Sequence, residues 1–252
     1  MCISPDWFWI RRGPVWEKQE RGCRKCWQCI QSFMNDYVGR CLCEKAIADW
    51  VFVLRLSYRD CSERESDFAH KVITPRHLQD FVRSVRKRGH LFRYLAVGEY
   101  GEEKGRAHFH IVLFGVGEAP PWYEFEENVH IDTWPHGHVY IQSNPDERGL
   151  RYVVKYLYKS DGSKKWYTVS KKPPLAHQFF MEKAFRDFSL GVIPSRWVYS
   201  PPGGDPATVY YMTGASRLIY ISTFAIDLNT HSLAFLKCSS GDKPDNCKSR
   251  RT

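Results

Sequence analysis

The segment RAHFHIVLFG places two histidines two residues apart within a run of strand-forming residues. Successive side chains of a β-strand point to opposite faces of the sheet. His108 and His110 therefore share one face. Phe109 and Ile111 share the other face, where a core must cover them. We predict a strand over Ala107–Phe114, in a sheet with at least one apolar face.

The first two-thirds of the chain supplies the other elements of an α+β domain. Strand-forming residues and apolar spacing at helical period predict strands over 50–58, 91–99, 107–114 and 139–142, and helices over 27–49, 75–89 and 147–159. In chain order these elements read helix, strand, helix, strand, strand, strand, helix. This order is typical of a central antiparallel β-sheet with helices packed on one face, so the predicted fold class is α+β.

The chain divides into four segments. We expect an N-terminal cysteine-rich, helical segment over residues 1–49, in which residues 1–22 are irregular. A core domain follows over 50–160, and an irregular C-terminal extension over 161–238, with a helix over 177–188 and a strand over 217–226. The segment 239–252 is expected to be a disordered basic tail.

Charge and aromatic content favour a partner with phosphates and unpaired bases. The chain has 37 Lys and Arg against 28 Asp and Glu, a net charge of +9, and 15% aromatic residues. Basic groups neutralise phosphates and aromatic rings stack on bases, which suits a single-stranded nucleic-acid binder. The sequence has no apolar run of transmembrane length and no signal-peptide pattern, so we expect a cytoplasmic protein without a membrane partner.

A carboxylate close to the two histidines indicates a metal site. Glu99 ends the strand before them, and the turn that follows returns the chain to His108. Two imidazoles and one carboxylate, with other positions open, are typical of a catalytic Mg²⁺ or Mn²⁺ site. Glu102 and Glu103 in the turn are the alternative carboxylates.

The helix predicted over 147–159 carries an unusual number of phenols and ammonium groups. Tyr152 and Tyr156 are one helical turn apart and share a face, and Lys155 and Lys159 have the same spacing. A tyrosine can attack a phosphate and form a covalent intermediate, while a lysine stabilises the phosphate charge. The alternative is an amphipathic surface helix whose tyrosines cover the edge of the core.

Five of the nine cysteines lie between residues 23 and 43. A tetrahedral zinc site would use Cys23, Cys26 and Cys29 with either Cys41 or Cys43. We favour the alternative, in which reduced cysteines pack as small apolar side chains.

In combination these segments resemble the replication initiation proteins of small single-stranded DNA phages, the gokushovirus-like Microviridae. The resemblance covers roughly residues 20–160 and rests on a series of segments in the same order: GCRKCWQC, WVFVLRLSY, GEYG, RAHFHIVLFG, WPHGHVYI and YVVKYLYK. The family's cysteine segment often begins Pro-Cys-Gly-x-Cys, and here Gly22-Cys23-Arg24-Lys25-Cys26 replaces it.

The resemblance implies an HUH-type endonuclease, with an RRM-like sheet, that starts rolling-circle replication. His108 and His110 would bind Mg²⁺ or Mn²⁺ with Glu99 as third ligand. Tyr156 or Tyr152 would attack single-stranded origin DNA, leaving a 5′-phosphotyrosine link and a free 3′-OH. Family members with two tyrosines can alternate them, and the sequence does not say which attacks first. Tyr158, off the shared face, ranks third among the candidate nucleophiles.

The same resemblance implies the partners. Lys159, Arg151 and Arg106 would contact the DNA, and His136 and His138 form a second, lower-ranked histidine pair in a loop. Host DNA polymerase and a host helicase would act with the protein in the cytoplasm of a bacterial host. The sequence has no Walker-type loop, so strand separation must come from elsewhere.

Two other functions compete with this interpretation. A relaxase or a small transposase of the same superfamily fits less well, because relaxases carry the tyrosine near the N-terminus and small transposases usually carry one tyrosine. A non-catalytic binder of single-stranded nucleic acid explains the composition, but it gives no reason for grouping Glu99, His108 and His110.

Overall fold

The computed structural model describes residues 2–59, 72–101, 105–122, 129–158 and 166–239. The chain forms two compact units. The first comprises Met1–Leu175 and Ser200–Tyr210, and the second Ala176–Tyr199 and Tyr211–Thr252. The predicted basic tail lies almost entirely outside the described residues.

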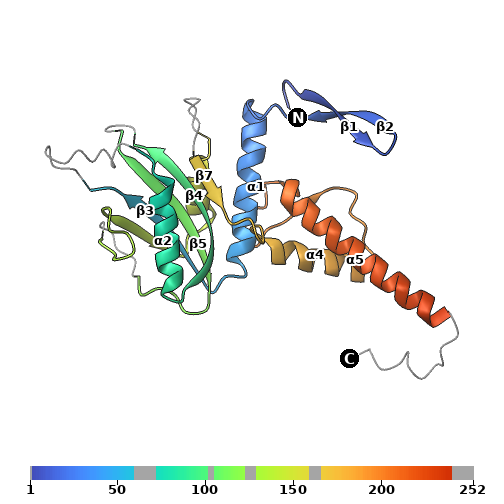
Figure 1. Ribbon diagram of the computed structural model, residues 1–252. Helices are drawn as coiled ribbons and strands as arrows, with labels where there is room; N and C mark the ends of the chain where they lie inside the picture. The colour runs from blue at the N-terminus through green and yellow to red at the C-terminus, as the bar shows by residue number, and fades with distance from the viewer. Residues whose placement is uncertain (1, 60–71, 102–104, 123–128, 159–165, 240–252) are drawn as a thin grey trace. The chain divides into compact units, whose positions relative to one another are not determined.

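A five-stranded antiparallel sheet is the centre of the first unit (Figure 1). Its strands are β3 (Trp50–Ser57), β4 (Leu91–Tyr100), β5 (Ala107–Val116), β6 (Val139–Ser143) and β7 (Trp166–Val169). The order across the sheet is β6-β3-β5-β4-β7, so the histidine-bearing strand β5 lies in the middle. The predicted α+β class is confirmed, and the four predicted strands are present. The edge strand β7 was not predicted.

Helix α2 (Pro75–Lys87) covers one face of this sheet (Figure 1). The stripe of Leu78, Phe81 and Val85 is buried against the alternate side chains of the strands, which include Phe109 and Ile111 of β5. This packing explains why the segment is helical, because residues three and four apart line one side of a helix.

The opposite face of the sheet is also covered, by α1 (Trp27–Lys45) and α3 (Glu147–Lys155). The expectation that all helices lie on one face is therefore wrong. The reason is that a central strand has apolar side chains on both faces: Val112 of β5, on the second face, is fully buried. A buried ion pair of 3.2 Å between Arg93 of β4 and Glu44 joins α1 to the sheet.

The N-terminal segment begins with a β-hairpin, although we expected residues 1–22 to be irregular. Strands β1 (Asp6–Arg12) and β2 (Val15–Arg21) pair in antiparallel register, and Gly13 takes the positive φ of 61° that the tight turn needs. Tryptophans remain exposed on this hairpin, so its sequence lacks the apolar and polar alternation of a half-buried strand.

The second unit contains two helices, α4 (His177–Ser189) and α5 (Gly214–Ser239). The first unit contributes only part of β9 (Tyr210–Tyr211), and β8 (Val198–Tyr199) is equally short. The predicted helix over 177–188 is confirmed. The strand predicted over 217–226 is wrong, because this segment lies within α5.

Burial explains the helical conformation of the segment that we predicted as a strand. Ser216, Ile219, Tyr220 and Thr223 are buried at helical spacing, and the hydroxyl of Tyr220 donates to the carboxylate of Asp187 in α4 at 2.8 Å. None of the helices in the described ranges combines the length and the apolar character that crossing a membrane requires.

Candidate metal and tyrosine site

Three potential metal ligands meet on adjacent strands of the sheet. Glu99 of β4 pairs directly with His108 of β5, and His110 follows two residues along the same face. One oxygen of Glu99, Oε1, lies 2.7 Å from Nε2 of His108 and 3.2 Å from Nε2 of His110. The three ligand atoms lie within 4.8 Å of one another.

The orientation of His108 suits a metal ligand. Its Nδ1 lies 3.1 Å from the backbone carbonyl oxygen of Arg106. A carbonyl only accepts hydrogen bonds, so Nδ1 carries the hydrogen and Nε2, which faces Glu99, is left as the ligand atom.

Burial and hydrogen bonding set the charge of the other two groups. Burial acts to raise the pKa of Glu99, but hydrogen bonds from His108 and His110 outweigh it and lower this pKa to about 2. The carboxylate is therefore ionised at neutral pH. Burial lowers the pKa of His110, which is only 2% exposed, and this favours the neutral imidazole that a metal requires.

The donor set of these three residues fits a divalent cation. Two imidazole nitrogens and one carboxylate oxygen converge from rigid strands, and one dication would relieve the crowding of a carboxylate between two rings. The alternative carboxylates, Glu102 and Glu103, lie outside the described residues.

Helix α3 brings two tyrosines to this site. The ring of Tyr156 stacks on the ring of His110, with centroids 4.2 Å apart and an interplanar angle of 9°. The ring of Tyr152 meets His110 edge-on at 5.7 Å, and the two phenol rings are 5.2 Å apart. The helix face that the sequence predicts for the tyrosines therefore lies against the histidines.

The two tyrosines differ in exposure. Tyr152 is 46% exposed, whereas Tyr156 is 8% exposed beneath it. The ammonium of Lys155 lies 4.1 Å from the ring centre of Tyr152 and 4.9 Å from that of Tyr156. One positive charge thus serves both phenols.

Helix α3 ends at Lys155, four residues earlier than predicted. The amides of Tyr156, Leu157 and Tyr158 bond to carbonyls three residues back, which tightens the last turn. Tyr156 is the C-cap and keeps a helical conformation, so it stays on the face of Tyr152. Lys159 lies outside the described residues.

The remaining predicted residues lie around this group. Tyr158 donates to the backbone oxygen of Arg24 at 3.3 Å, and its ring meets that of Phe33 in α1 edge-on at 5.1 Å. Arg106 donates to the backbone oxygen of Tyr58 at 3.4 Å, next to His108 in the chain.

The second histidine pair lies among other aromatic rings. His136 stacks on His77 with ring centres 3.9 Å apart, and His138 lies 4.3 Å from His130. The role of His136 and His138 as phosphate contacts stays a prediction.

Arg55 is a site residue that the sequence analysis missed. It lies on β3 directly opposite His110, and its guanidinium is 5.7 Å from the ring centre of Tyr140 on the next strand. Its charge acts to lower the pKa of His110. Only the pairing of β3 with β5 reveals this neighbour, because the two residues are far apart in sequence.

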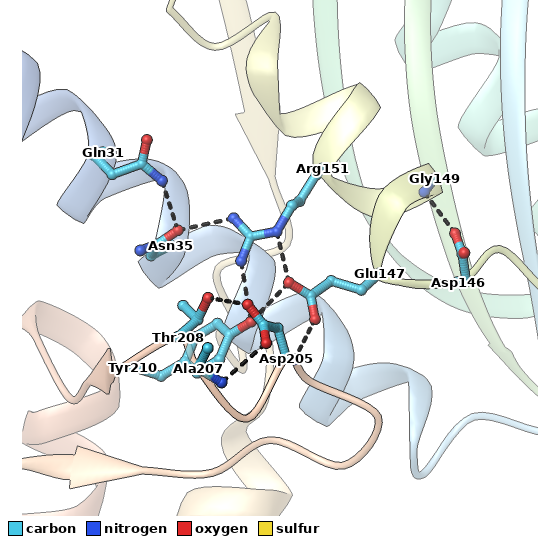
Figure 2. A network of polar contacts seen from close by, with 10 residues as sticks. All are labelled: Gln31, Asn35, Asp146, Glu147, Gly149, Arg151, Asp205, Ala207, Thr208 and Tyr210. Carbon is cyan, nitrogen blue, oxygen red and sulfur yellow. Dashed lines mark hydrogen bonds and ion pairs between the residues drawn. The ribbon is translucent and has the colours of Figure 1, made fainter.

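Arg151, predicted to bind DNA, takes part in a polar network that holds α3 in place (Figure 2). Its Nε donates to Oε1 of Glu147 at 2.6 Å and its Nη1 to Asn35 of α1 at 2.9 Å. Tyr210 donates to the same oxygen of Glu147 at 3.0 Å, and the amide of Asp205 donates to the other oxygen. The contact of Arg151 with DNA stays a prediction, and its protein contacts position the tyrosine helix.

Replacing Arg151 with alanine is expected to lower the free energy of unfolding by about 1–3 kcal/mol, because Glu147 loses a charged donor in a half-buried place. Urea denaturation monitored by circular dichroism measures this. Arg148→Ala, an exposed arginine of the same helix, is the control and should change the stability by less than about 0.5 kcal/mol. Equal stability of both variants would contradict the proposed network.

The cysteines group differently from the expectation. Cys41 and Cys43 are buried in α1, and 12 residues of helix separate Cys41 from Cys29, about 18 Å. Burial raises the pKa of Cys41 to about 12. The residue that joins Cys23, Cys26 and Cys29 is instead Cys2.

The fold and the site define a class of protein: an antiparallel sheet whose central strands carry a Glu-His-His group beneath a helix with two tyrosines. Residues 52–161, which include that group, match the family model that is named for the replication-associated protein ORF2. This segment belongs to that family, and the resemblance to phage replication initiation proteins is confirmed.

Two curated relatives are similar to the chain. Replication-associated protein ORF4 of Chlamydia phage 1 is 30% identical over 155 residues, which is 54% of this chain and 37% of that protein. Replication-associated protein ORF2 of Spiroplasma virus 4 is 31% identical over 100 residues, 37% of this chain and 31% of that protein. The chain thus spans about a third of the length of these relatives. No solved structure matches it.

Proposed function

We propose that this protein initiates rolling-circle replication by nicking single-stranded origin DNA through attack of a tyrosine, as an HUH-type endonuclease. The single observation that carries the proposal is the contact of both Tyr152 and Tyr156 with His110. A phosphodiester placed there would touch a phenol and the Glu-His-His group at once. The family of residues 52–161 supports a role in replication.

Glu99, His108 and His110 would hold a Mg²⁺ or Mn²⁺ ion. Such an ion, when bound, withdraws charge from a phosphate oxygen and makes the phosphorus more electrophilic. The strands fix the ligands before DNA arrives, because the register of β4 and β5 places Glu99 and His108 side by side.

The tyrosine supplies the nucleophile. Its phenol oxygen forms a bond to phosphorus, and its proton passes to solvent. The bond from phosphorus to the 3′ oxygen breaks, and that oxygen takes up a proton to become the free 3′-OH. The DNA is then joined to the protein through a 5′-phosphotyrosine.

Two positive side chains would stabilise this transfer. Lys155 lies over both phenol rings and favours the phenolate form of either. Arg55 lies beside His110 on the same face and would neutralise charge on the phosphate. With both rings within reach of His110, one tyrosine can hold a strand while the other attacks a second phosphodiester.

The proposed partners follow from this reaction. Lys159, Arg151 and Arg106 are the candidate contacts to the DNA backbone, and the net charge of +9 favours binding to it. A free 3′-OH is a primer, so we propose that host DNA polymerase extends it while a host helicase separates the strands, in the cytoplasm of a bacterial host.

The test is a covalent adduct. The full chain is incubated with labelled single-stranded origin DNA and Mn²⁺, then denatured and separated by electrophoresis. We expect an adduct that survives denaturation and that chelator removes. Normal DNA binding with no adduct under Mg²⁺ or Mn²⁺ would support the non-catalytic binder instead.

A further inference from the structure

A cluster of four thiols lies in the N-terminal segment. Cys2 precedes the hairpin of β1 and β2, while Cys23, Cys26 and Cys29 follow it at the start of α1. Their sulfur atoms all lie within 4.8 Å of one another, and those of Cys2 and Cys26 are 3.8 Å apart. All four are free cysteines, so no disulfide accounts for the approach. We propose that these four cysteines bind one structural zinc ion.

Backbone amides already point at the sulfur atoms. The amide of Cys23 donates to the sulfur of Cys2, and the amide of Cys26 donates to the sulfur of Cys23, both at 3.3 Å. Amide donors favour the thiolate, which is the form that binds a metal. Such bonds also fix the direction of each sulfur before a metal arrives.

The ionisation of the cluster is consistent with a missing positive charge. Hydrogen bonds from the amides of Ile3 and Cys29 lower the pKa of Cys26 to about 6. The amide of Arg24 acts to lower the pKa of Cys29, but burial and the neighbouring sulfurs leave it raised to about 12. Four thiolates repel one another at this spacing, and a dication removes the repulsion.

Close packing around the sulfurs requires a small residue. A Cβ atom built on Gly22 would lie 2.8 Å from the sulfur of Cys29, closer than real contacts allow. The backbone just before Cys23 thus passes directly over the cluster. A side chain at position 22 would push Cys29 away from the other three sulfurs.

The hairpin gives the metal a structural task. A two-stranded hairpin is marginally stable alone in water, and this one leaves Trp7, Trp9 and Trp16 more than half exposed. A zinc ion bound by Cys2 on one side and by Cys23, Cys26 and Cys29 on the other would close the base of the hairpin and tie it to α1. Four protein sulfurs leave no open position, so this zinc is structural and independent of the site at Glu99.

Metal analysis of the full chain tests the proposal. After anaerobic purification with zinc in the medium, mass spectrometry of the metals should find about one zinc per chain. X-ray absorption should show four sulfur neighbours at about 2.3 Å. Cobalt substitution of the wild-type protein should give the strong thiolate-to-metal absorption bands of a tetrahedral sulfur site, and this readout needs no variant.

Matched variants separate the four ligands from the other cysteines. Cys2→Ser and Cys26→Ser should each lower the zinc content by about fivefold or more, and Cys41→Ser should leave it unchanged. Removal of zinc should also speed cleavage by trypsin at the exposed Lys18 and Arg21 of the hairpin.

Three outcomes would overturn the proposal: wild-type protein without zinc after anaerobic loading, zinc retained in Cys2→Ser and Cys26→Ser, or a disulfide between these residues in freshly prepared protein. None of them would affect the proposed nuclease, because adduct formation at Tyr152 or Tyr156 is measured separately.

Discussion

The double variant with Tyr152→Phe and Tyr156→Phe is expected to form no covalent adduct with origin DNA, a loss of roughly a thousandfold or more. Each ring keeps its size and its packing against His110, so only the two nucleophilic oxygens are removed. Gel electrophoresis of denatured reactions with labelled DNA measures the loss.

Single variants and a control make this result specific. Tyr152→Phe and Tyr156→Phe alone should each retain some adduct, because either phenol lies within reach of the same imidazole. Tyr158→Phe removes a hydroxyl of the same segment that bonds to the backbone of Arg24 instead, and should leave adduct formation unchanged. An undiminished adduct in the double variant would exclude both proposed nucleophiles.

His108→Ala is expected to reduce cleavage by roughly a hundredfold or more while DNA affinity stays within about threefold of wild type. The reason is that affinity comes mainly from phosphate contacts by basic side chains, whereas His108 faces Glu99 at 2.7 Å. Cleavage is measured as the initial rate of adduct formation in Mn²⁺, and affinity as fluorescence anisotropy of labelled single-stranded DNA.

The matched control is His90→Ala. His90 lies at the turn before β4, where its ring contacts the backbone oxygen of Glu118, and its loss should affect neither measurement. If His108→Ala lost affinity and cleavage in equal proportion, His108 would be a DNA-binding residue and not a metal ligand.

The sequence predicts the parts of the site that depend on local pattern. Alternation of faces places His108 and His110 together, and the short connection from Glu99 fixes the register in which β4 returns to β5. The spacing of Tyr152 and Tyr156 predicts their common face in the same way. These are properties of a single strand, hairpin or helix.

Contacts between distant segments are not predictable in this way. Arg55 becomes a neighbour of His110 only through the pairing of β3 with β5. Cys2 reaches Cys26 only because residues 6–21 form a hairpin that brings its ends together. Arg151 is a basic residue on a predicted DNA-binding helix, and its engagement with Glu147 and Asn35 is visible only once α1 and α3 pack together.

Local propensity also misleads where tertiary packing decides. The segment 217–226 is rich in β-branched and aromatic residues, yet it is helical because Ile219 and Tyr220 are buried at helical spacing. The hairpin residues Trp7 and Trp9 are exposed, so the apolar pattern that usually indicates a strand is missing there.

The most direct test of the central claim is to identify the amino acid that becomes attached to DNA. The adduct formed with Mn²⁺ is digested with nuclease and protease, and mass spectrometry locates the remaining phosphate or nucleotide. The phosphate should be found on Tyr152 or Tyr156, and only in samples prepared without chelator. A phosphate on Tyr158 or on another residue, or on either tyrosine without any divalent metal, would contradict the claim that these phenols and the Glu99-His108-His110 group act on one phosphodiester.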